Sequence, residues 1–464
     1  MLRLAGSQVE SLWDGFLPEE VRVLPDDLAR LDVLLADEGL LAPIASHWRG
    51  EAGAVGRSAV GHGRPTISMS TYVRLMVLKH RTGWGFETLM REVSDSLHLR
   101  RFCLIALGER VPDESTIRKL TRRLGPVVVD ELTRVVIAKA TRETRFRARA
   151  VRIDSTVVEA DVRYPTDSGL ALDSARVLAR EARGLVAKVG REAGWVSDRS
   201  RAIGRRVRAM TRTLSRRTGE RQAPVLKLTE QTGKLMARSV SEAKRLVAVA
   251  RRSARGRGAR AKLRQIQRLE QLIAKAQRVV EQIQMRMRGE RITDRLVSIF
   301  DPDARPIRKG KLGKPNEFGY VAQICEVTEN TKPGARGLIL PATTSIGNPK
   351  EETLLPATAI ELQRLGLCPR EVALDGGFEK GPAHRALDPL DPERMFIAGR
   401  EQPGSRRTQR RLGRYRTGAE GRISHLKRGY GLRRSRLKGH QGMRSWTGWG
   451  ILTYNLDTLA IRTG

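Results

Sequence analysis

Apolar residues recur every three or four positions through most of the first 145 residues, a spacing that predicts a series of amphipathic helices. Residues 1–62 contain such a helical segment and end in a glycine-rich loop. From residue 63 to residue 145 the pattern is helical throughout. Residues 69–80, for example, carry an apolar stripe, and Gly83 then ends the helix. We therefore expect an all-helical N-terminal region.

A second block with helical spacing, residues 171–290, is distinguished by its many arginines and lysines. Between Ile266 and Met287 its apolar positions alternate steps of three and four residues, as in the heptad seam of a coiled coil. An upstream helix over residues 228–249 carries a similar apolar stripe. The two stripes fit an antiparallel hairpin within one chain, and the seam alone equally fits a dimer. The sequence leaves both arrangements open.

Short apolar runs rich in strand-forming residues lie on either side of this block. They predict strands at residues 149–153, 296–300, 318–327, 337–344, 370–375 and 395–399. A helix is expected over residues 352–365. When the helical block is set aside, strands and helices follow one another as in an α/β sheet.

Two of the predicted strands end in an aspartate. Asp154 closes the first run, and Asp375 closes a later run just before a pair of glycines. An acid at the C-terminal end of a strand commonly marks an active site in an α/β sheet. Asp167 is a weaker candidate, because an aspartate in its setting, Pro-Thr-Asp-Ser, most often caps the helix that follows.

A third acid, Glu420, stands among many arginines as the one carboxylate between Glu401 and Asp457. On a helix, Arg416, Glu420 and Lys427 project from one face. An isolated pair of this kind is usually a surface salt bridge. Two strand-end acids and one helical acid can, however, gather oxygen ligands for hard divalent metals. Two-metal phosphoryl chemistry needs such a set, with the ions about 4 Å apart.

The composition narrows the class of partner. A formal net charge of +36 and an isoelectric point near 11.2 point to a polyanion, and nucleic acid is the simplest choice. No run approaches the roughly 18 apolar residues of a membrane span, and the N-terminal stretch lacks a signal-peptide core, so we expect a cytoplasmic protein. Three scattered cysteines and seven unpaired histidines predict neither a disulfide framework nor a zinc site.

Two basic segments are candidates for phosphate contacts. A short predicted helix presents Arg118 and Arg122, which suits a helix in the major groove as well as an ordinary solvated basic face. A Gly/Lys loop contains Lys309, Lys311 and Lys314. This loop lacks the spacing of a nucleotide-binding P-loop, so we expect it to hold a phosphate backbone.

Several stretches together resemble a DDE transposase of a bacterial insertion sequence, closest to the ISNCY-type group. They are Ile153-Asp154-Ser-Thr-Val-Val-Glu-Ala, Tyr164-Pro-Thr-Asp167-Ser-Gly-Leu, Lys314-Pro-Asn-Glu-Phe-Gly-Tyr, Leu374-Asp375-Gly-Gly-Phe and Glu420-Gly-Arg-Ile-Ser-His-Leu-Lys-Arg-Gly-Tyr-Gly-Leu-Arg-Arg-Ser. Related transposases carry Tyr, two residues, Arg, three residues, Glu, six residues and Lys around the third acid. Arg416, Glu420 and Lys427 fit this spacing, whereas Gly413 stands at the tyrosine position and the nearest tyrosine is Tyr415.

The resemblance implies an α/β RNase H-like catalytic domain formed by residues 146–170 and 291–464. It also implies an all-α N-terminal region, with a DNA-binding part at residues 63–145, and a coiled-coil-like helical insertion at residues 171–290. In an RNase H-like sheet the first and fourth strands are neighbours. Asp154 and Asp375 would then meet, and Glu420 would approach them from a flanking helix.

The implied activity is DNA cleavage at the ends of an insertion sequence, followed by strand transfer into target DNA. Asp154, Asp375 and Glu420 would be the catalytic residues and would hold two Mg²⁺ ions, which Mn²⁺ can replace, while Arg416 and Lys427 would contact phosphate. The partners would be element ends, target DNA and a second copy of the chain, in the bacterial cytoplasm at the nucleoid. The alternatives are a DNA-binding protein without catalysis and an RNase H-like nuclease that does not join strands.

Overall fold

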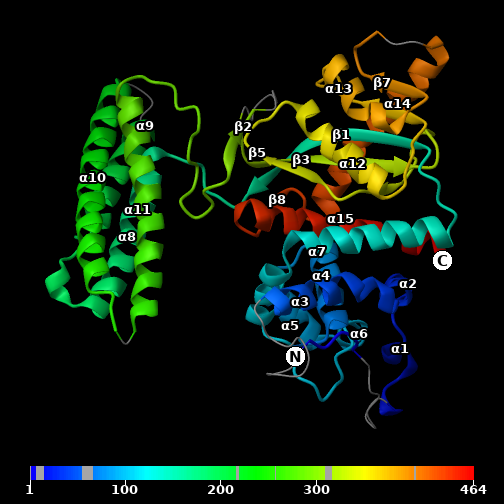
Figure 1. The fold of residues 1–464 in the computed structure, drawn as a ribbon, viewed down its shortest axis with the longest axis horizontal. Coiled ribbons are helices and arrows are strands. Elements are labelled where there is room, and N and C mark those ends of the chain that lie inside the picture. Colours follow the sequence, from blue (N-terminus) through cyan, green and yellow to red (C-terminus); the bar gives the residue numbers. More distant parts are fainter. Residues whose placement is uncertain are drawn as a thin grey trace. The chain divides into compact units, whose positions relative to one another are not determined.

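The computed structural model describes residues 2–6, 15–54, 66–215, 219–256, 258–308, 316–401 and 404–463. It divides into two compact units (Figure 1). The first comprises Met1–Asp161 and Gly319–Gly464, and the second is Val162–Phe318. Each unit buries a large apolar cluster of its own.

The N-terminal part of the first unit is helical in its described residues, as the periodicity predicts. Its helices are α1 (Glu19–Arg22), α2 (Asp26–Leu35), η2 (Glu38–Leu41), α3 (Ala42–Ala54), α4 (Met69–Thr82), α5 (Phe86–Asp95), α6 (Leu97–Phe102) and α7 (Glu114–Glu143). Gly83 ends α4 with a φ of 71°, a conformation that favours glycine. Asp113 caps α7, and Gly125 interrupts that helix with a φ of 64° just before Pro126. The predicted basic helix is therefore the first section of α7.

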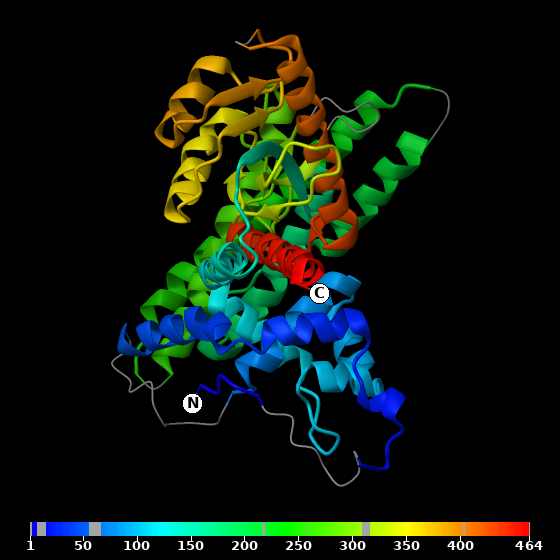
Figure 2. The same cartoon turned by 90° about the vertical axis from the view of Figure 1, so that its right-hand side faces the viewer.

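The last helix, α15 (Gly439–Thr463), completes the core of the first unit. It lies beside α7, as both views show (Figures 1 and 2). Trp449 is 1% exposed and meets Tyr72 of α4 edge to face, with ring centroids 5.7 Å apart. The apolar C-terminal stretch is thus the buried face of a helix.

A mixed sheet forms the rest of the first unit. Its strands are β1 (Ala150–Ala160), β3 (Glu317–Thr328), β4 (Leu338–Ile339), β5 (Thr343–Ile346), β6 (Glu371–Leu374), β7 (Arg394–Ile397) and β8 (Arg434–Ser435). The order runs β3-β1-β6-β7, with β4 and β5 both pairing β3 and β8 pairing β1. β3 is antiparallel to β1, β4 and β5, whereas β6 is parallel to both β1 and β7.

Side chains alternate between the two faces of this sheet, and different helices cover them. Val151, Ile153, Val372 and Leu374 join the large apolar cluster of the unit, together with Leu355 and Leu362 of α12. Ala150 and Ala373 instead pack on Tyr415 of α14. The helices in this part of the chain are η4 (Glu351–Leu354), α12 (Leu355–Arg364), α13 (Lys380–Leu387), η5 (Asp388–Leu390) and α14 (Arg406–Gly429). Figure 2 shows α12 and α14 on opposite sides of the strands.

The second unit is a bundle of long helices. Its elements are α8 (Asp167–Val189), η3 (Arg191–Ala193), α9 (Ser200–Ser215), α10 (Gln222–Arg252), α11 (Ala259–Met287) and the short strand β2 (Arg305–Ile307). The predicted seam is buried within the chain: Ile266, Leu269 and Ile273 of α11 share one apolar cluster with residues of α8 and α10. The hairpin of α10 and α11 is therefore present, and α8 and α9 extend it to a bundle.

One predicted strand, at residues 296–300, is wrong. Leu296, Val297 and Ile299 are buried, the first and last in the core of the helical unit, but the backbone forms no strand. The side chain of Gln282 on α11 instead accepts a hydrogen bond from the Leu296 amide and donates one to its carbonyl. Burial against helices therefore produced an apolar run that resembles a strand.

Candidate active site

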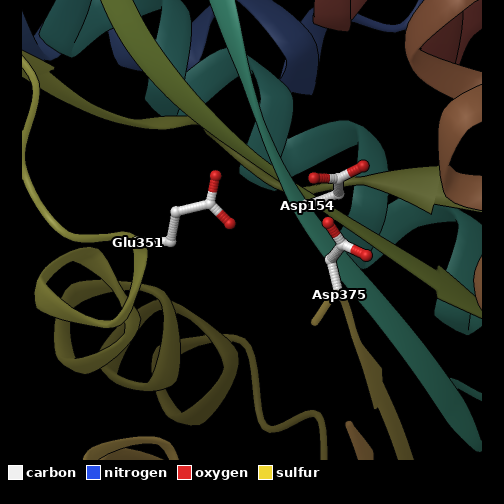
Figure 3. Close-up of side chains that lie close together, drawn as sticks. All are labelled: Asp154, Glu351 and Asp375. Atoms are coloured by element: carbon white, nitrogen blue, oxygen red, sulfur yellow. The ribbon is translucent and has the colours of Figure 1, made fainter. Parts of the chain in front are cut away.

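The pairing of β1 with β6 brings two of the predicted acids together. The strands are parallel, and Ala150–Ile153 pair in register with Glu371–Leu374. Asp154 and Asp375 each follow the last pair of this ladder. They are therefore side by side at the end of the paired region, as the sequence predicts (Figure 3).

Asp154 does not end its strand, which corrects the expectation. β1 continues to Ala160, because β3 pairs with it in antiparallel register from Ala150 to Glu159. Only the partner on the other side changes: β6 stops at Leu374, and β8 takes over at Glu159 and Ala160. Asp154 thus lies where β1 loses its parallel neighbour, and the strand carrying it is held firmly on its β3 side.

A third carboxylate, Glu351, joins the two aspartates. Asp154, Glu351 and Asp375 each offer an oxygen, and these three atoms lie within 4.8 Å of one another; we call them the carboxylate cluster. Glu351 begins η4 and points toward the two aspartates from the segment before α12 (Figure 3). A Cβ on Gly377 would lie 3.0 Å from Glu351 Oε2, so the lack of a side chain at Gly377 leaves room for this carboxylate. All three residues are partly exposed.

Sequence reasoning missed Glu351. Two consecutive glutamates, Glu351 and Glu352, stand at the start of the predicted helix, and acids are common at helix N-termini because they interact favourably with the helix dipole. Nothing local separates a glutamate in that role from one turned toward the ends of two distant strands. Only the proximity of Asp154 and Asp375 in the structure makes Glu351 a candidate metal ligand.

Glu420 lies outside the carboxylate cluster and is connected to it through Arg416. Arg416 Nη1 donates to Asp375 Oδ1 at 2.7 Å and to Glu420 Oε1 at 3.1 Å. The Glu420 side chain is 62% exposed, whereas Arg416 is 18% exposed. The predicted face of α14 is thus present, with Arg416 placed between the helical acid and the strand acid.

A buried ion network fixes α14 against the sheet. Arg152 of β1 and Glu326 of β3 stand opposite one another in the ladder and form an ion pair at 2.7 Å. Arg152 Nη1 also donates to the Tyr415 carbonyl of α14 at 3.1 Å. Arg422 of α14 donates to the second oxygen of Glu326 at 2.9 Å. Since breaking a buried pair leaves an uncompensated charge, this network holds the helix carrying Arg416 and Glu420 firmly in place.

The structure also shows what surrounds Gly413, which stands at the expected tyrosine position, and the nearby Tyr415. Gly413 faces β7, where a Cβ would lie 3.4 Å from the ring of Phe396. Tyr415 is buried between α14 and the sheet, with its hydroxyl 2.7 Å from Thr328 Oγ1. Burial raises the pKa of the Tyr415 phenol above its ordinary value. Tyr415 is therefore a neutral packing residue of the sheet face.

The remaining predicted residues lie elsewhere or outside the described part of the chain. Lys427 is partly buried on α14, and Arg118 and Arg122 are exposed on α7. Lys309, Lys311 and Lys314 fall outside the described residues.

Asp167 belongs to the second unit, where it is 5% exposed and pairs with Arg286 and Arg295 of that unit. Thr166, not Asp167, is the cap of α8, because its hydroxyl accepts from the Gly169 amide. Asp167 therefore anchors α8 within the bundle through its ion pairs.

The carboxylate cluster has the chemistry of a site for hard cations. Three oxygens from separate elements converge, and Mg²⁺ and Ca²⁺ prefer oxygen ligands. One of the elements, β1, is paired along both of its edges up to Asp154. Among the described residues, no helix is long and apolar enough to cross a membrane.

Comparison with known proteins finds a similarity for part of the first unit. Residues 22–123 match the family model described as a transposase domain (DUF772). Over 126 residues the chain is 28% identical to a protein of Rhizobium meliloti described as "Uncharacterized protein ORF8 in nfe locus", which covers 26% of this chain. The chain spans 61% of the length of that relative. No solved structure matches. The match of residues 22–123 confirms the predicted resemblance of the chain to transposases.

Proposed function

We propose that the chain is a DDE transposase that cuts DNA at the ends of an insertion sequence and transfers the freed strands into target DNA. The observation that carries the proposal is the meeting of Asp154 and Asp375 at the end of the β1–β6 ladder, in a chain that also contains a transposase domain. The net charge of +36 supports a DNA partner. Because two element ends must be held together, the active form would be a homodimer or a higher assembly.

The strand order supports an RNase H-like core. The order β3-β1-β6-β7, with an antiparallel β3 and parallel β6 and β7, is the arrangement expected if β1 is the first strand and β6 the fourth. In this interpretation the helical unit is an insertion that begins shortly after β1. The central neighbours β1 and β6 then come from segments more than two hundred residues apart in sequence.

Asp154, Asp375 and Glu351 are the residues that fit a divalent ion. When bound, Mg²⁺ ions in such a site activate an attacking hydroxyl or water and stabilise the leaving oxygen of a phosphodiester. The cluster offers one oxygen each from β1, from the turn after β6 and from η4, so the ligands do not depend on a single flexible loop. Mn²⁺, which also accepts oxygen ligands, would substitute.

Arg416 has two roles in the proposal. It neutralises Asp375 and holds Glu420 within reach of the cluster. A phosphate oxygen of DNA could compete for the same guanidinium, because arginine binds carboxylates and phosphates in the same way. Binding of a strand would then release Glu420 and Asp375 to act as ligands together. Lys427, further along α14, would contribute a phosphate contact.

The proposal is tested with supercoiled plasmid DNA carrying the element's ends, incubated with Mg²⁺ or with EDTA. We expect nicking at the element boundary in Mg²⁺ and none in EDTA. Asp154→Asn and Asp375→Asn should lower the rate by at least about a hundredfold, since metal-assisted stabilisation contributes several kcal/mol and each 1.36 kcal/mol is tenfold. Transfer of the cut end into a second plasmid separates the transposase from a nuclease that does not join.

Glu379→Gln is the matched control, because Glu379 is an exposed glutamate that pairs with Lys350 outside the carboxylate cluster. It should retain wild-type cleavage. Comparing the cleavage rates of Glu351→Gln and Glu420→Gln decides which glutamate the reaction needs. Wild-type rates in Asp375→Asn would refute the assignment, and DNA binding without cleavage by the wild-type protein would favour a non-catalytic DNA-binding protein.

A further inference from the structure

A basic cleft of about 960 Å³ opens within the first unit, and none of the predicted acids Asp154, Asp375 and Glu420 lines it. It is lined by the end of α4 and the start of α5, by the first section of α7, and by the segment joining β8 to α15. Five cationic side chains line it: Lys79, Arg118, Arg122, Arg436 and Lys438. None of the described residues that line it is an aspartate or glutamate.

The positive charge of this cleft is only partly compensated. Arg118 pairs with Glu114 at 2.7 Å, but both side chains are exposed, so this pair is weak. Arg436 reaches Asp161 at 3.9 Å and is 65% exposed. Lys79 is 2% exposed, and its ammonium donates to the Trp84 carbonyl at 2.7 Å, which leaves its charge unbalanced. Cations that repel one another in a concave site favour a bound anion.

The surroundings of Lys79 disfavour its charged form, first through burial and then through repulsion by its cationic neighbours. Burial, together with the positive charges of Arg436 and Arg118, lowers the pKa of Lys79 to about 8. The lysine therefore stays mostly protonated at neutral pH despite being almost fully buried. Its ammonium lies 4.4 Å from the ring centre of Phe86 and 5.0 Å from that of Trp446, so aromatic faces supply part of its solvation.

The cleft also offers an aromatic surface. Trp84 lines it and is partly exposed, between Gly83 and Gly85 at the turn from α4 to α5. Proteins that bind single-stranded nucleic acid combine a positively charged groove with aromatic side chains on which bases stack. Phosphate-binding cations and a stacking ring thus occur together here.

The size of the cleft argues against a double helix. A cube of the same volume has sides of about 10 Å, whereas the major groove of B-DNA alone is about 12 Å wide. The cleft therefore accommodates a short stretch of a single strand. We propose that this cleft binds an unpaired DNA strand, with Trp84 stacking on a base and Arg436, Lys438 and Arg122 contacting its phosphates.

This inference rests on the proposed function only in taking DNA as the partner, and it requires no cleavage. Single strands arise when the end of an element is cut or its terminal base pairs open. The cleft would hold such a strand at the transposase domain, since its α4 residues and most of its α7 residues belong to residues 22–123. It also gives Arg118 and Arg122 a role that differs from inserting α7 into a major groove.

The test is photocrosslinking of the full-length protein to a short oligonucleotide that contains 5-iodouracil, in EDTA so that no cleavage occurs. Mass spectrometry of the digested product should locate the crosslink at Trp84. The same oligonucleotide in a duplex should give little crosslink there. Because EDTA suppresses metal chemistry, failure of this test is distinct from failure of the cleavage test above.

Binding of the same oligonucleotide is measured by fluorescence anisotropy. We expect Trp84→Leu to weaken it about tenfold, because stacking of one base on an aromatic ring contributes this much. Arg436→Ala/Lys438→Ala should weaken it by a similar factor and reduce the salt dependence. The control is Arg91→Ala/Arg364→Ala, which removes two exposed arginines of the same unit that are each paired with a glutamate and do not line the cleft.

The control should change affinity by less than about threefold. Equal losses in the control and in Arg436→Ala/Lys438→Ala would overturn the proposal, since the cleft would then contribute only general charge. A crosslink mapped away from the cleft would also overturn it. Competition by a free mononucleotide as strong as competition by the oligonucleotide would show a site for nucleotides and not for a strand.

Discussion

Two glycines on α14, three positions apart, should respond in opposite ways to the same substitution. A Cβ added at Gly418 would lie 1.9 Å from Nη1 of Arg152 and 2.8 Å from its Cζ. A Cβ added at Gly421 would meet nothing within 4 Å. Both glycines lie within one helix, so alanine improves helix propensity equally at both positions.

The size of each effect follows from these contacts. Ordinary contact begins at 3.4 Å, so Arg152 or α14 must shift by about 1.5 Å, the difference from 1.9 Å, to accommodate Gly418→Ala. Displacing Arg152 weakens its ion pair with the buried Glu326, which costs about 3 kcal/mol. This value is at the low end for a buried ion pair, because Glu326 keeps its second partner, Arg422. Alanine recovers about 1 kcal/mol of helix propensity, so the net loss is about 2 kcal/mol, against a gain of up to about 1 kcal/mol in Gly421→Ala.

Urea unfolding followed by tryptophan fluorescence measures this difference. Four of the described tryptophans, Trp48, Trp84, Trp446 and Trp449, belong to the first unit and report on its unfolding. Cleavage by the same variants tests the site. Gly418→Ala should lower the rate by about a hundredfold, because a displacement of about 1 Å in a catalytic constellation has this effect. Gly421→Ala should cleave as the wild type does.

Equal stabilities of the two variants would refute the argument that α14 is packed tightly on Arg152. A loss of stability in Gly418→Ala without a loss of cleavage would instead show that the position of α14 does not matter for the reaction.

Three further predictions concern separate parts of the molecule. In thermal melts of the wild type, Mg²⁺ at a hundred times its dissociation constant should stabilise the protein by about 2.7 kcal/mol, and Asp154→Asn should abolish this gain without any DNA present. The pKa of Lys79 is lowered to about 8 from 10.5, so folding disfavours its protonated form. The wild type should therefore gain stability relative to Lys79→Met as the pH rises from 8 to 10.5, by an amount on the order of 3 kcal/mol. A constant difference in unfolding free energy between the two proteins over this range would contradict the argument. Thr166→Ala should destabilise α8 by about 1 kcal/mol through loss of its cap, and the amide of Gly169 should then exchange its hydrogen faster. The control is Thr211→Ala, which changes an exposed threonine within α9 and should leave that exchange unchanged.

The elements that the sequence predicted well are those with local causes. The helices of the N-terminal region, the seam from Ile266 onward and the two runs before Asp154 and Asp375 all have a clear periodicity or a clear run of strand-forming residues. The failures arise where the same local pattern has another cause. The run at residues 296–300 is apolar because Leu296 and Ile299 are buried in the core of the helical unit, where Gln282 satisfies the backbone of Leu296.

The candidate site was predictable in part. Asp154 and Asp375 could be proposed because each follows an apolar run, and the β1–β6 register then brings them together. The extension of β1 to Ala160 could not, since it depends on the antiparallel partner β3, which is far away in sequence. Glu351 could not be singled out, because its local sequence is that of any acidic helix N-terminus.

The sequence by itself determined the periodicities, the excess of positive charge and the aspartates at the ends of two apolar runs, because these depend on neighbours along the chain. The tertiary structure alone decided that Glu351 meets Asp154 and Asp375, and that Arg416 stands between Asp375 and Glu420. It also distinguished Gly418 from Gly421, two identical residues on one helix. The physical reason is that such contacts are set by strand register and by the packing of α14 on the sheet, which join residues remote in sequence.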